Sequence, residues 1–204
     1  RLFALADEQQ ATFSPEVLRQ VRANLRLIDD SLRVNPTANR IFLRLLSDAR
    51  DPEGVLRSMN EAGVLGHFIP DFGRVISMMQ FNMYHHFTVD EHLIRTIGFL
   101  SDIERGKYAL EHPVSTEIIR TIDNRRALFV AVLLHDIAKG RDEDHSQAGA
   151  RIARELGPRL GLTPSETETA TWLVEHHLVM STFAQSRDLN DPKTIRDFAD
   201  LVQS

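Results

Sequence analysis

The chain has 204 residues, a formal net charge of −5 at pH 7 and no cysteine. The lack of cysteine excludes a disulfide scaffold and a thiolate zinc site, and leaves histidine and carboxylate as the strong metal ligands. The negative charge disfavours a non-specific nucleic-acid binder, and no segment resembles a signal peptide or reaches membrane-spanning length. We expect a cytoplasmic protein of one domain, or of one domain with an appendage.

Three pairs of a capping residue and a proline mark helix starts in the first part of the chain. Ser14-Pro15 opens an amphipathic stretch that is expected to continue as a helix to about Leu32. Asn35-Pro36 and Asp51-Pro52 repeat the pattern before two further apolar stretches. Gly63 is expected just past the end of the second of these helices.

Similar signals continue through the second part. Thr88-Val89-Asp90-Glu91 is predicted to form a capping box at the start of a helix that carries His92. Asn124 is expected to cap a helix that ends in His135-Asp136. Asp144 is expected to cap the next helix, which we predict to end at Gly157.

The last helices begin with the same combination of residues. Thr163-Pro164-Ser165-Glu166 joins a capping box to a proline and predicts a helix ending near His177, and Asp191-Pro192 opens a final helix. No alternation of period two persists, and no hairpin signal is present. The predicted fold class is therefore all-α. Four phenylalanines are expected in its core: Phe81, Phe87, Phe99 and Phe129.

The adjacent pair His135-Asp136 is the strongest chemical signal. It follows the apolar run 127–134, so it is expected to end a buried helix, where unpaired polar groups are costly. A divalent metal is the simplest partner, because imidazole and carboxylate suit Zn, Mn and Fe, and carboxylate also suits Mg. Eight of the nine histidines lie at or after His85.

The candidate ligands lie at the ends of four predicted helices, and helical bundles build metal sites from such residues. They are His92, His135, Asp136, His145, His176 and His177. Each also has an ordinary interpretation, as a surface histidine or as part of a helix cap. His176 and His177 cannot both point the same way, so one of them is expected to lie behind the ligands or in solvent. The other histidines (His67, His85, His86 and His112) are expected to be structural or on the surface, with His85 and His86 near the cleft entrance.

The order His…His-Asp…His…His on helices, from about residue 88 to 177, resembles the HD-domain metal-dependent phosphohydrolases. Longer pieces are similar to the HD region of the bacterial bifunctional uridylyltransferase/uridylyl-removing enzyme, which acts on the PII nitrogen-signalling protein. These pieces are Met59–Pro70, Met83–His92, Trp172–Leu178 and Arg187–Pro192.

The resemblance implies a helical HD fold with an N-terminal helical extension. We expect a helical linker or bundle over 1–82 and a C-terminally incomplete HD domain over 83–204. The full-length family has a nucleotidyltransferase domain before this region and two ACT domains after it. The chain starts at Arg1 without methionine, so we interpret it as a fragment of a longer polypeptide. The Gly-Ser and paired-carboxylate signature of a nucleotidyltransferase is absent from the sequence, so we expect that the fragment does not add UMP by itself.

The activity implied by the resemblance is removal of UMP from a tyrosine of PII. One divalent ion, Mg or Mn with Fe or Zn as alternatives, would be held by His92, His135 and Asp136. A second would be held by His145 and by His176 or His177, with Asp136 bridging, and family spacing favours His176. Asp136 and Lys139 are the catalytic candidates, although Lys139 could instead only complement a helix C-terminus.

Some features leave alternatives open. HD sites usually have a further aspartate ligand on a later helix. In the resembled enzyme this aspartate lies past the segment that ends at Ser204, and the late candidates in this chain are Asp197 and Asp200. The expected partner is UMP-modified PII, with no membrane and no nucleic acid. The alternatives are an HD nucleotidase or phosphodiesterase acting on a small nucleotide, and a regulatory scaffold module with a slow HD site.

Overall fold

The computed structural model describes residues 1–79 and 87–202, and every regular element in them is a helix. This confirms the all-α fold. None of the helices in the described part of the chain is long and apolar enough to cross a membrane. The predicted boundary between residues 82 and 83 lies outside the described residues, as do Phe81, His85 and His86.

The first part of the chain contains seven α-helices and one short 3-10 helix. In order they are α1 (Leu2–Gln9), α2 (Pro15–Ala23), η1 (Leu25–Leu27), α3 (Asp30–Arg33), α4 (Pro36–Ser47), α5 (Pro52–Glu61), α6 (Val64–Phe68) and α7 (Pro70–Val75).

The described residues after position 86 contain the helices that carry the candidate site. They are α8 (Val89–Glu104), α9 (Pro113–Ile118), η2 (Ile119–Thr121), α10 (Arg125–Leu134), α11 (His145–Leu160), α12 (Pro164–Glu175), α13 (Val179–Ser186) and α14 (Pro192–Val202).

Most of the predicted helix starts are confirmed by side-chain caps. Ser14, Asn35, Asp51 and Asp144 each accept a hydrogen bond from a backbone N–H in the first turn of the following helix. Thr163 forms the complete capping box, in which Glu166 also accepts from the Thr163 N–H at 2.8 Å. A cap uses residues within one turn, which is why it can be predicted from local sequence.

Two of the predicted caps are wrong. Neither Thr88 nor Asn124 makes a side-chain cap hydrogen bond. Glu91 does not turn back to Thr88, because Arg57 of α5 and Arg95 on the next turn both engage its carboxylate. A long-range ion pair therefore replaces the local box.

The predicted helix from Ser14 to Leu32 is interrupted. It stops at Ala23, and Asp29 starts a new helix by accepting from the Leu32 N–H at 2.9 Å. No residue of α2 is fully buried, and only partly buried side chains such as Leu18 and Val21 pack against the core, so tertiary packing favours a longer helix only weakly.

The predicted end at Gly157 is also wrong, because α11 continues through Pro158 to Leu160. The chain leaves the helix at Gly161, where φ is +97°. A Cβ on Gly157 would lie 2.9 Å from the Thr167 side chain, so this glycine permits close approach of α11 to α12. The close approach and the buried Leu160 keep the last turn helical.

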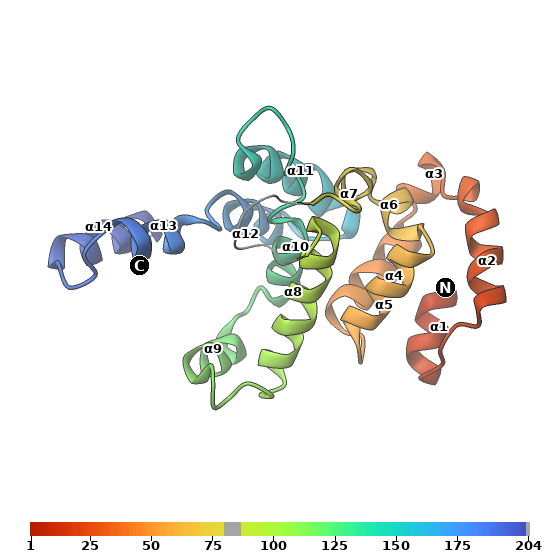
Figure 1. Ribbon diagram of the computed structural model, residues 1–204, viewed down its shortest axis with the longest axis horizontal. Helices are drawn as coiled ribbons and strands as arrows, with labels where there is room; N and C mark the ends of the chain where they lie inside the picture. The colour runs from red at the N-terminus through yellow and green to blue at the C-terminus, as the bar shows by residue number, and fades with distance from the viewer. Residues whose placement is uncertain (80–86, 203–204) are drawn as a thin grey trace.

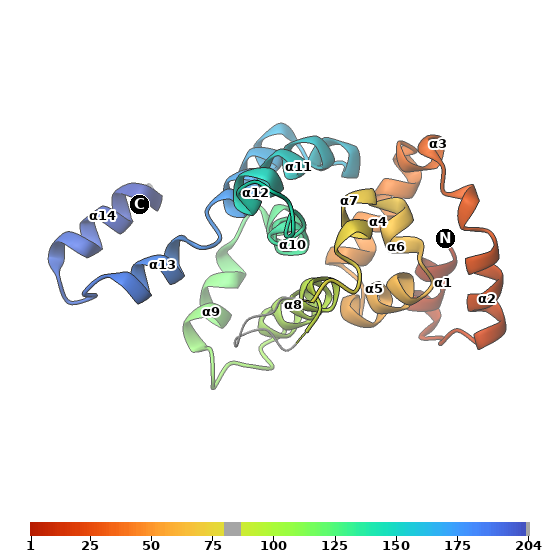
Figure 2. The ribbon, with the colours of Figure 1, turned by 45° about the horizontal axis from the view of Figure 1, so that its top comes forward.

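The candidate site lies where α8, α10, α11 and α12 meet. Helix α10 packs against the other three, and α4 and α5 join the first part of the chain to them. The largest fully buried side chains include Phe129 of α10 and Leu93 and Ile97 of α8. Helices α13 and α14 extend away from these packed helices, at the end opposite α1–α3 (Figures 1 and 2).

Arg125 ties three helices together at the start of α10. Its guanidinium contacts Glu104 at the end of α8, the Ser47 carbonyl, and Asp48 just after α4 at 2.8 Å. Such a charge-assisted network has several fixed partners and orients the helices more strongly than a single exposed pair. The start of α10 is therefore anchored while its other end reaches the candidate site.

Candidate metal centre

Asp136 is the centre of the candidate site. It follows the last turn of α10 and is only 3 % exposed, between the buried Leu134 and Ile137. Apolar neighbours on both sides fix the backbone there and hold the carboxylate inside the protein. A buried carboxylate needs partners, and four imidazoles and one ammonium surround it.

The first group of potential ligands lies at Asp136 Oδ2. His92, in the first turns of α8, places Nε2 at 3.6 Å from this oxygen, and His135 places Nε2 at 3.5 Å. The two Nε2 atoms are 3.0 Å apart. These three side chains therefore offer two nitrogens and one oxygen to a common point.

The second group lies at the other carboxylate oxygen. His145, the first residue of α11, has Nε2 at 3.6 Å from Asp136 Oδ1, and His177, just after α12, has Nε2 at 3.5 Å. The two groups share Asp136, one at each oxygen. A single carboxylate could thus bridge two ions.

Backbone contacts set the direction of the lone pairs in two of the imidazoles. His135 Nδ1 lies 2.8 Å from the Val132 carbonyl oxygen, and His177 Nδ1 lies 2.7 Å from that of Val174. A carbonyl can only accept, so each Nδ1 carries the proton and donates. In the neutral ring, Nε2 is then an unprotonated nitrogen directed at Asp136, the arrangement of metal-binding histidines.

The side chains fit a metal in two further respects. Nε2 of His145 and Nε2 of His177 are buried and have no hydrogen-bond partner. Leaving such an atom unsatisfied costs about 1–3 kcal/mol, which a bound cation would remove. Ligand atoms about 2.0–2.1 Å from one ion are roughly 2.8–3.4 Å apart at adjacent vertices. The two Nε2 atoms of the first group are 3.0 Å apart, and each Nε2 lies 3.5–3.6 Å from its Asp136 oxygen.

Electrostatics keep the cluster in the protonation state that a cation needs. Burial lowers the pKa of His135 to about 4, against the raising effect of Asp136, and burial also lowers the pKa of His145. For Asp136, burial alone would raise the pKa, but contacts with His177, His135 and Lys139 hold it well below its usual range. At neutral pH, Asp136 is charged and the His135 and His145 rings are neutral.

Lys139 lies beside the two groups. Its Nζ is 2.6 Å from Asp136 Oδ2, and its side chain is 18 % exposed. The ammonium is therefore at the site and is oriented by the carboxylate. It adds a positive charge beside the two ligand groups.

Other predicted site residues lie elsewhere. The sequence analysis favoured His176 over His177, whereas the structure turns His176 away: its ring stacks on Trp172 with centroids 4.5 Å apart. Asp197 pairs with Arg187 at 2.7 Å in the extended α13–α14 segment, and Asp200 is exposed there. Neither aspartate is in the two ligand groups.

The sequence analysis assigned no functional role to the residues that follow His92 on α8, and it placed Phe99 in the core. Helical spacing from His92 reaches Arg95, Thr96 and Phe99, and these side chains line one cavity with His92. Positions three, four and seven residues after a candidate ligand lie on its side of a helix. This helical spacing is the sequence signal that could have identified these cavity residues.

Two protein-family models match the chain. Residues 1–68 match the Uridylyltransferase GlnD third domain, and residues 89–203 match the HD domain. The second match covers more than half of the chain and contains every residue of the two ligand groups.

Proposed function

The chain belongs to the HD-domain family, and we propose that it removes UMP from a uridylylated tyrosine of the PII signal protein. As a member of this superfamily it is a metal-dependent phosphohydrolase. The two family matches together correspond to the HD region of the uridylyltransferase/uridylyl-removing enzyme. The choice of substrate, the PII partner and the cytoplasmic location are parts of the proposal, as is the division into 1–82 and 83–204.

The observation that carries the proposal is the shared carboxylate. Asp136 presents one oxygen to His92 and His135 and the other to His145 and His177. We assign these five residues as the ligands of divalent cations, with Mg or Mn favoured for phosphoryl chemistry. A bound cation supplies a nucleophilic hydroxide at neutral pH and Lewis-acid stabilisation of the phosphoryl oxygens.

The chain's own residues supply orientation and charge. The protonated Nδ1 atoms of His135 and His177 fix their rings through backbone carbonyls. Lys139, held by Asp136, can shift its ammonium toward the negative charge of an entering phosphodiester and stabilise the charge that develops in the transition state.

The leaving group suits this set of residues. A tyrosine phenolate has a pKa of about 10 in water, which makes it a far better leaving group than an alkoxide. A strong general acid is therefore not required for the P–O bond to break. The phenolate takes its proton from solvent after it departs.

The test uses the purified chain and PII that carries UMP on tyrosine. After metal removal with EDTA, UMP release is measured by chromatography with and without Mn²⁺ or Mg²⁺. We expect release only with metal in the wild type, and none in Asp136→Asn. Metal-independent release, or full activity of Asp136→Asn, would contradict the site. Rapid hydrolysis of free nucleotides with no release from UMP-PII would replace PII with a small-nucleotide substrate.

A further inference from the structure

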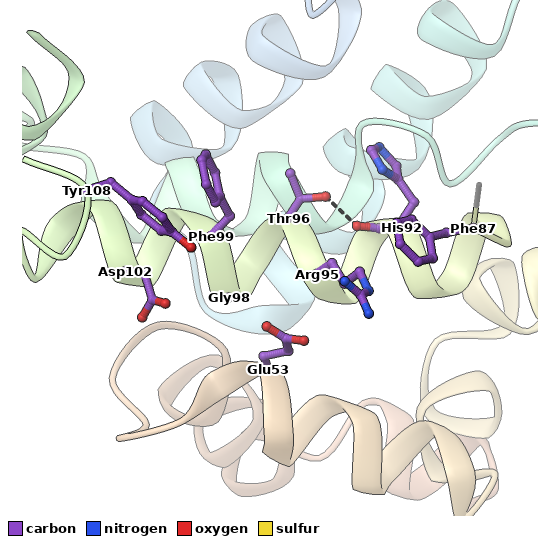
Figure 3. A pocket seen from close by; sticks show the side chains of 9 residues that line it. All are labelled: Glu53, Phe87, His92, Arg95, Thr96, Gly98, Phe99, Asp102 and Tyr108. Atoms are coloured by element: carbon purple, nitrogen blue, oxygen red, sulfur yellow. Dashed lines mark hydrogen bonds between the residues drawn. The ribbon is translucent and has the colours of Figure 1, made fainter. Parts of the chain in front are cut away.

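A cavity of about 340 Å³ begins at His92 and runs along the outside of α8. Figure 3 shows that His92, Thr96 and Phe99 project from the same side of this helix, with Tyr108 beside Phe99. His92 belongs to the first ligand group, so the cavity borders the candidate metal centre at this residue. The cavity is therefore placed to hold a part of the substrate that is attached to the phosphoryl group.

The length of this row of side chains matches a nucleotide rather than a free phosphate. Phe99 lies seven residues after His92, and at a rise of 1.5 Å per residue this is about 10 Å along the helix axis. A phosphoryl group at the metal centre would thus be followed by a ribose near Thr96 and a base near Phe99. A methyl or phosphate group alone would leave the far end empty.

The far end of the cavity presents aromatic surface. Phe99 was expected in the core, but it is 40 % exposed, because Leu93, Ile94 and Ile97 occupy the buried face of α8. Its ring centroid lies 4.7 Å from that of Tyr108, which holds it in place. An exposed ring beside a cavity offers a π-face on which a planar base can stack.

The other side of the cavity is lined by charged side chains, two carboxylates and the guanidinium of Arg95. Figure 3 shows the carboxylates of Asp102 and Glu53 on the side of α8 opposite Phe99. Each is already paired with a cation, Asp102 with Lys107 at 2.7 Å and Glu53 with Arg57 at 2.7 Å. Carboxylates accept hydrogen bonds, so these two side chains offer acceptors to hydroxyl groups of a bound molecule.

Gly98 keeps this wall close to the helix. A Cβ at that position would lie 2.0 Å from Glu53 Oε2 and 2.9 Å from Glu53 Cβ. Any larger residue would push the Glu53 carboxylate away from α8. The glycine therefore lets Glu53 contribute to the cavity.

We propose that this cavity is the nucleoside subsite of the enzyme, in which the base stacks on Phe99 beside Tyr108 while the phosphoryl group lies at His92. The proposal rests on the proposed hydrolysis of a UMP–tyrosine phosphodiester and assigns the nucleoside side of that bond. The tyrosine side then lies away from the outer face of α8.

The test compares two phosphodiesters that share one leaving group. Uridine 5′-monophosphate p-nitrophenyl ester carries the nucleoside, and methyl p-nitrophenyl phosphate does not; both release p-nitrophenolate, which is followed by its absorbance. The measured quantity is the ratio of their kcat/KM values in the presence of Mn²⁺. Both substrates report on the same folded fraction, so a partly unfolded variant does not change the ratio.

We expect the wild type to favour the uridine ester, and Phe99→Ala to lower the ratio by roughly 5- to 150-fold, the range expected for one base–aromatic stack. Phe99→Trp should restore most of it. Leu110→Ala is the matched control, because Leu110 is 93 % exposed two residues after Tyr108 and does not line the cavity. It should leave the ratio within about twofold, the error expected for an uninvolved surface site.

The outcomes separate the two proposals. A wild-type ratio near one, or an unchanged ratio in Phe99→Ala, would overturn the nucleoside subsite and leave the hydrolysis intact. Failure of the wild type on both esters and on UMP-PII would overturn the proposed function and the subsite together.

Discussion

Replacing His177 and His176 in turn by phenylalanine compares two adjacent imidazoles with opposite surroundings. His177 is 13 % exposed, its Nε2 has no hydrogen-bond partner, and this atom lies 3.5 Å from Asp136. His176 stacks on Trp172, and its Nδ1 lies 2.9 Å from the Trp172 carbonyl oxygen. Phenylalanine keeps an aromatic ring at either position but removes the nitrogens. Only His177→Phe should therefore change metal binding.

The size of the effect can be worked out as the rise in Tm that a bound cation gives. Each unsatisfied nitrogen costs about 1–3 kcal/mol while no cation is bound, so the two at His145 and His177 together cost about 2–6 kcal/mol. A cation at 100 times its dissociation constant stabilises the fold by about 2.7 kcal/mol. For a chain of this size that raises Tm by about 5–11 °C, at about 2–4 °C per kcal/mol. A variant that binds the cation 100-fold more weakly would keep only about 1–2 °C of this rise in Tm.

The assay is thermal unfolding of each variant in EDTA and in excess Mn²⁺. In EDTA, His177→Phe should be about as stable as the wild type, because losing an unsatisfied nitrogen offsets losing the Nδ1 hydrogen bond to Val174. With Mn²⁺ it should lose most of the rise in Tm, whereas His176→Phe should keep it. A full rise in His177→Phe, or an equal loss in both variants, would refute the assignment of His177 as a ligand.

Three further predictions concern the shared carboxylate, the helix contacts and a cap. Asp136→Asn should abolish metal-dependent hydrolysis, while His145→Ala should raise the metal concentration needed; equal losses at saturating metal would mean that the two groups act as one unit. Gly149→Val should lower the free energy of unfolding by about 1–3 kcal/mol in urea titrations, since even a Cβ there would lie 2.9 Å from Val174 Cγ1, and an unchanged midpoint would contradict this close packing. Glu166→Gln should cost about 0.3–1 kcal/mol at pH 7, because glutamine keeps the capping-box hydrogen bond but loses the negative charge that pairs with Arg126 and with the helix N-terminus. Burial raises the pKa of Glu166, but the Thr163 N–H and Arg126 lower it further, so the folded pKa is below the unfolded one. The stabilisation by ionised Glu166 is therefore present above its pKa in the unfolded chain and is lost as pH falls through its pKa in the folded protein. The difference in the free energy of unfolding between Glu166→Gln and the wild type should shrink in acid. A difference that stays constant with pH would contradict this.

The sequence analysis predicted features that depend on neighbouring residues and failed where distant residues decide the structure. Caps at Ser14, Asn35, Asp51 and Thr163 depend on neighbours within one turn, and these were predicted. The cap at Thr88 failed because Arg57, 34 residues before Glu91, engages the carboxylate that the box needs. Local sequence holds no information about that pairing.

The candidate site shows the same division. The pair His135-Asp136 was identified from its place after an apolar run, which is a local feature. The choice between His176 and His177 depends on how the chain turns after Glu175, and that turn is set by packing of α12 against α10 and α11. Phe99 was assigned to the core on its residue type alone, whereas the arrangement of Leu93 and Ile97 on α8 decides that it faces out.

The five proposed ligands come from four separate stretches of the chain. His92 and His135 are 43 residues apart, so no short segment can gather even the first group by itself. Loop closure over such distances precedes any gain from the ion, and the ion is therefore expected to bind only after α8, α10, α11 and α12 have docked. Metal affinity would then report on the docking of all four helices. A loosened contact between these helices, such as that of α11 at Gly149 beside Val174 and the His135 carbonyl, would then lower the affinity for the ion.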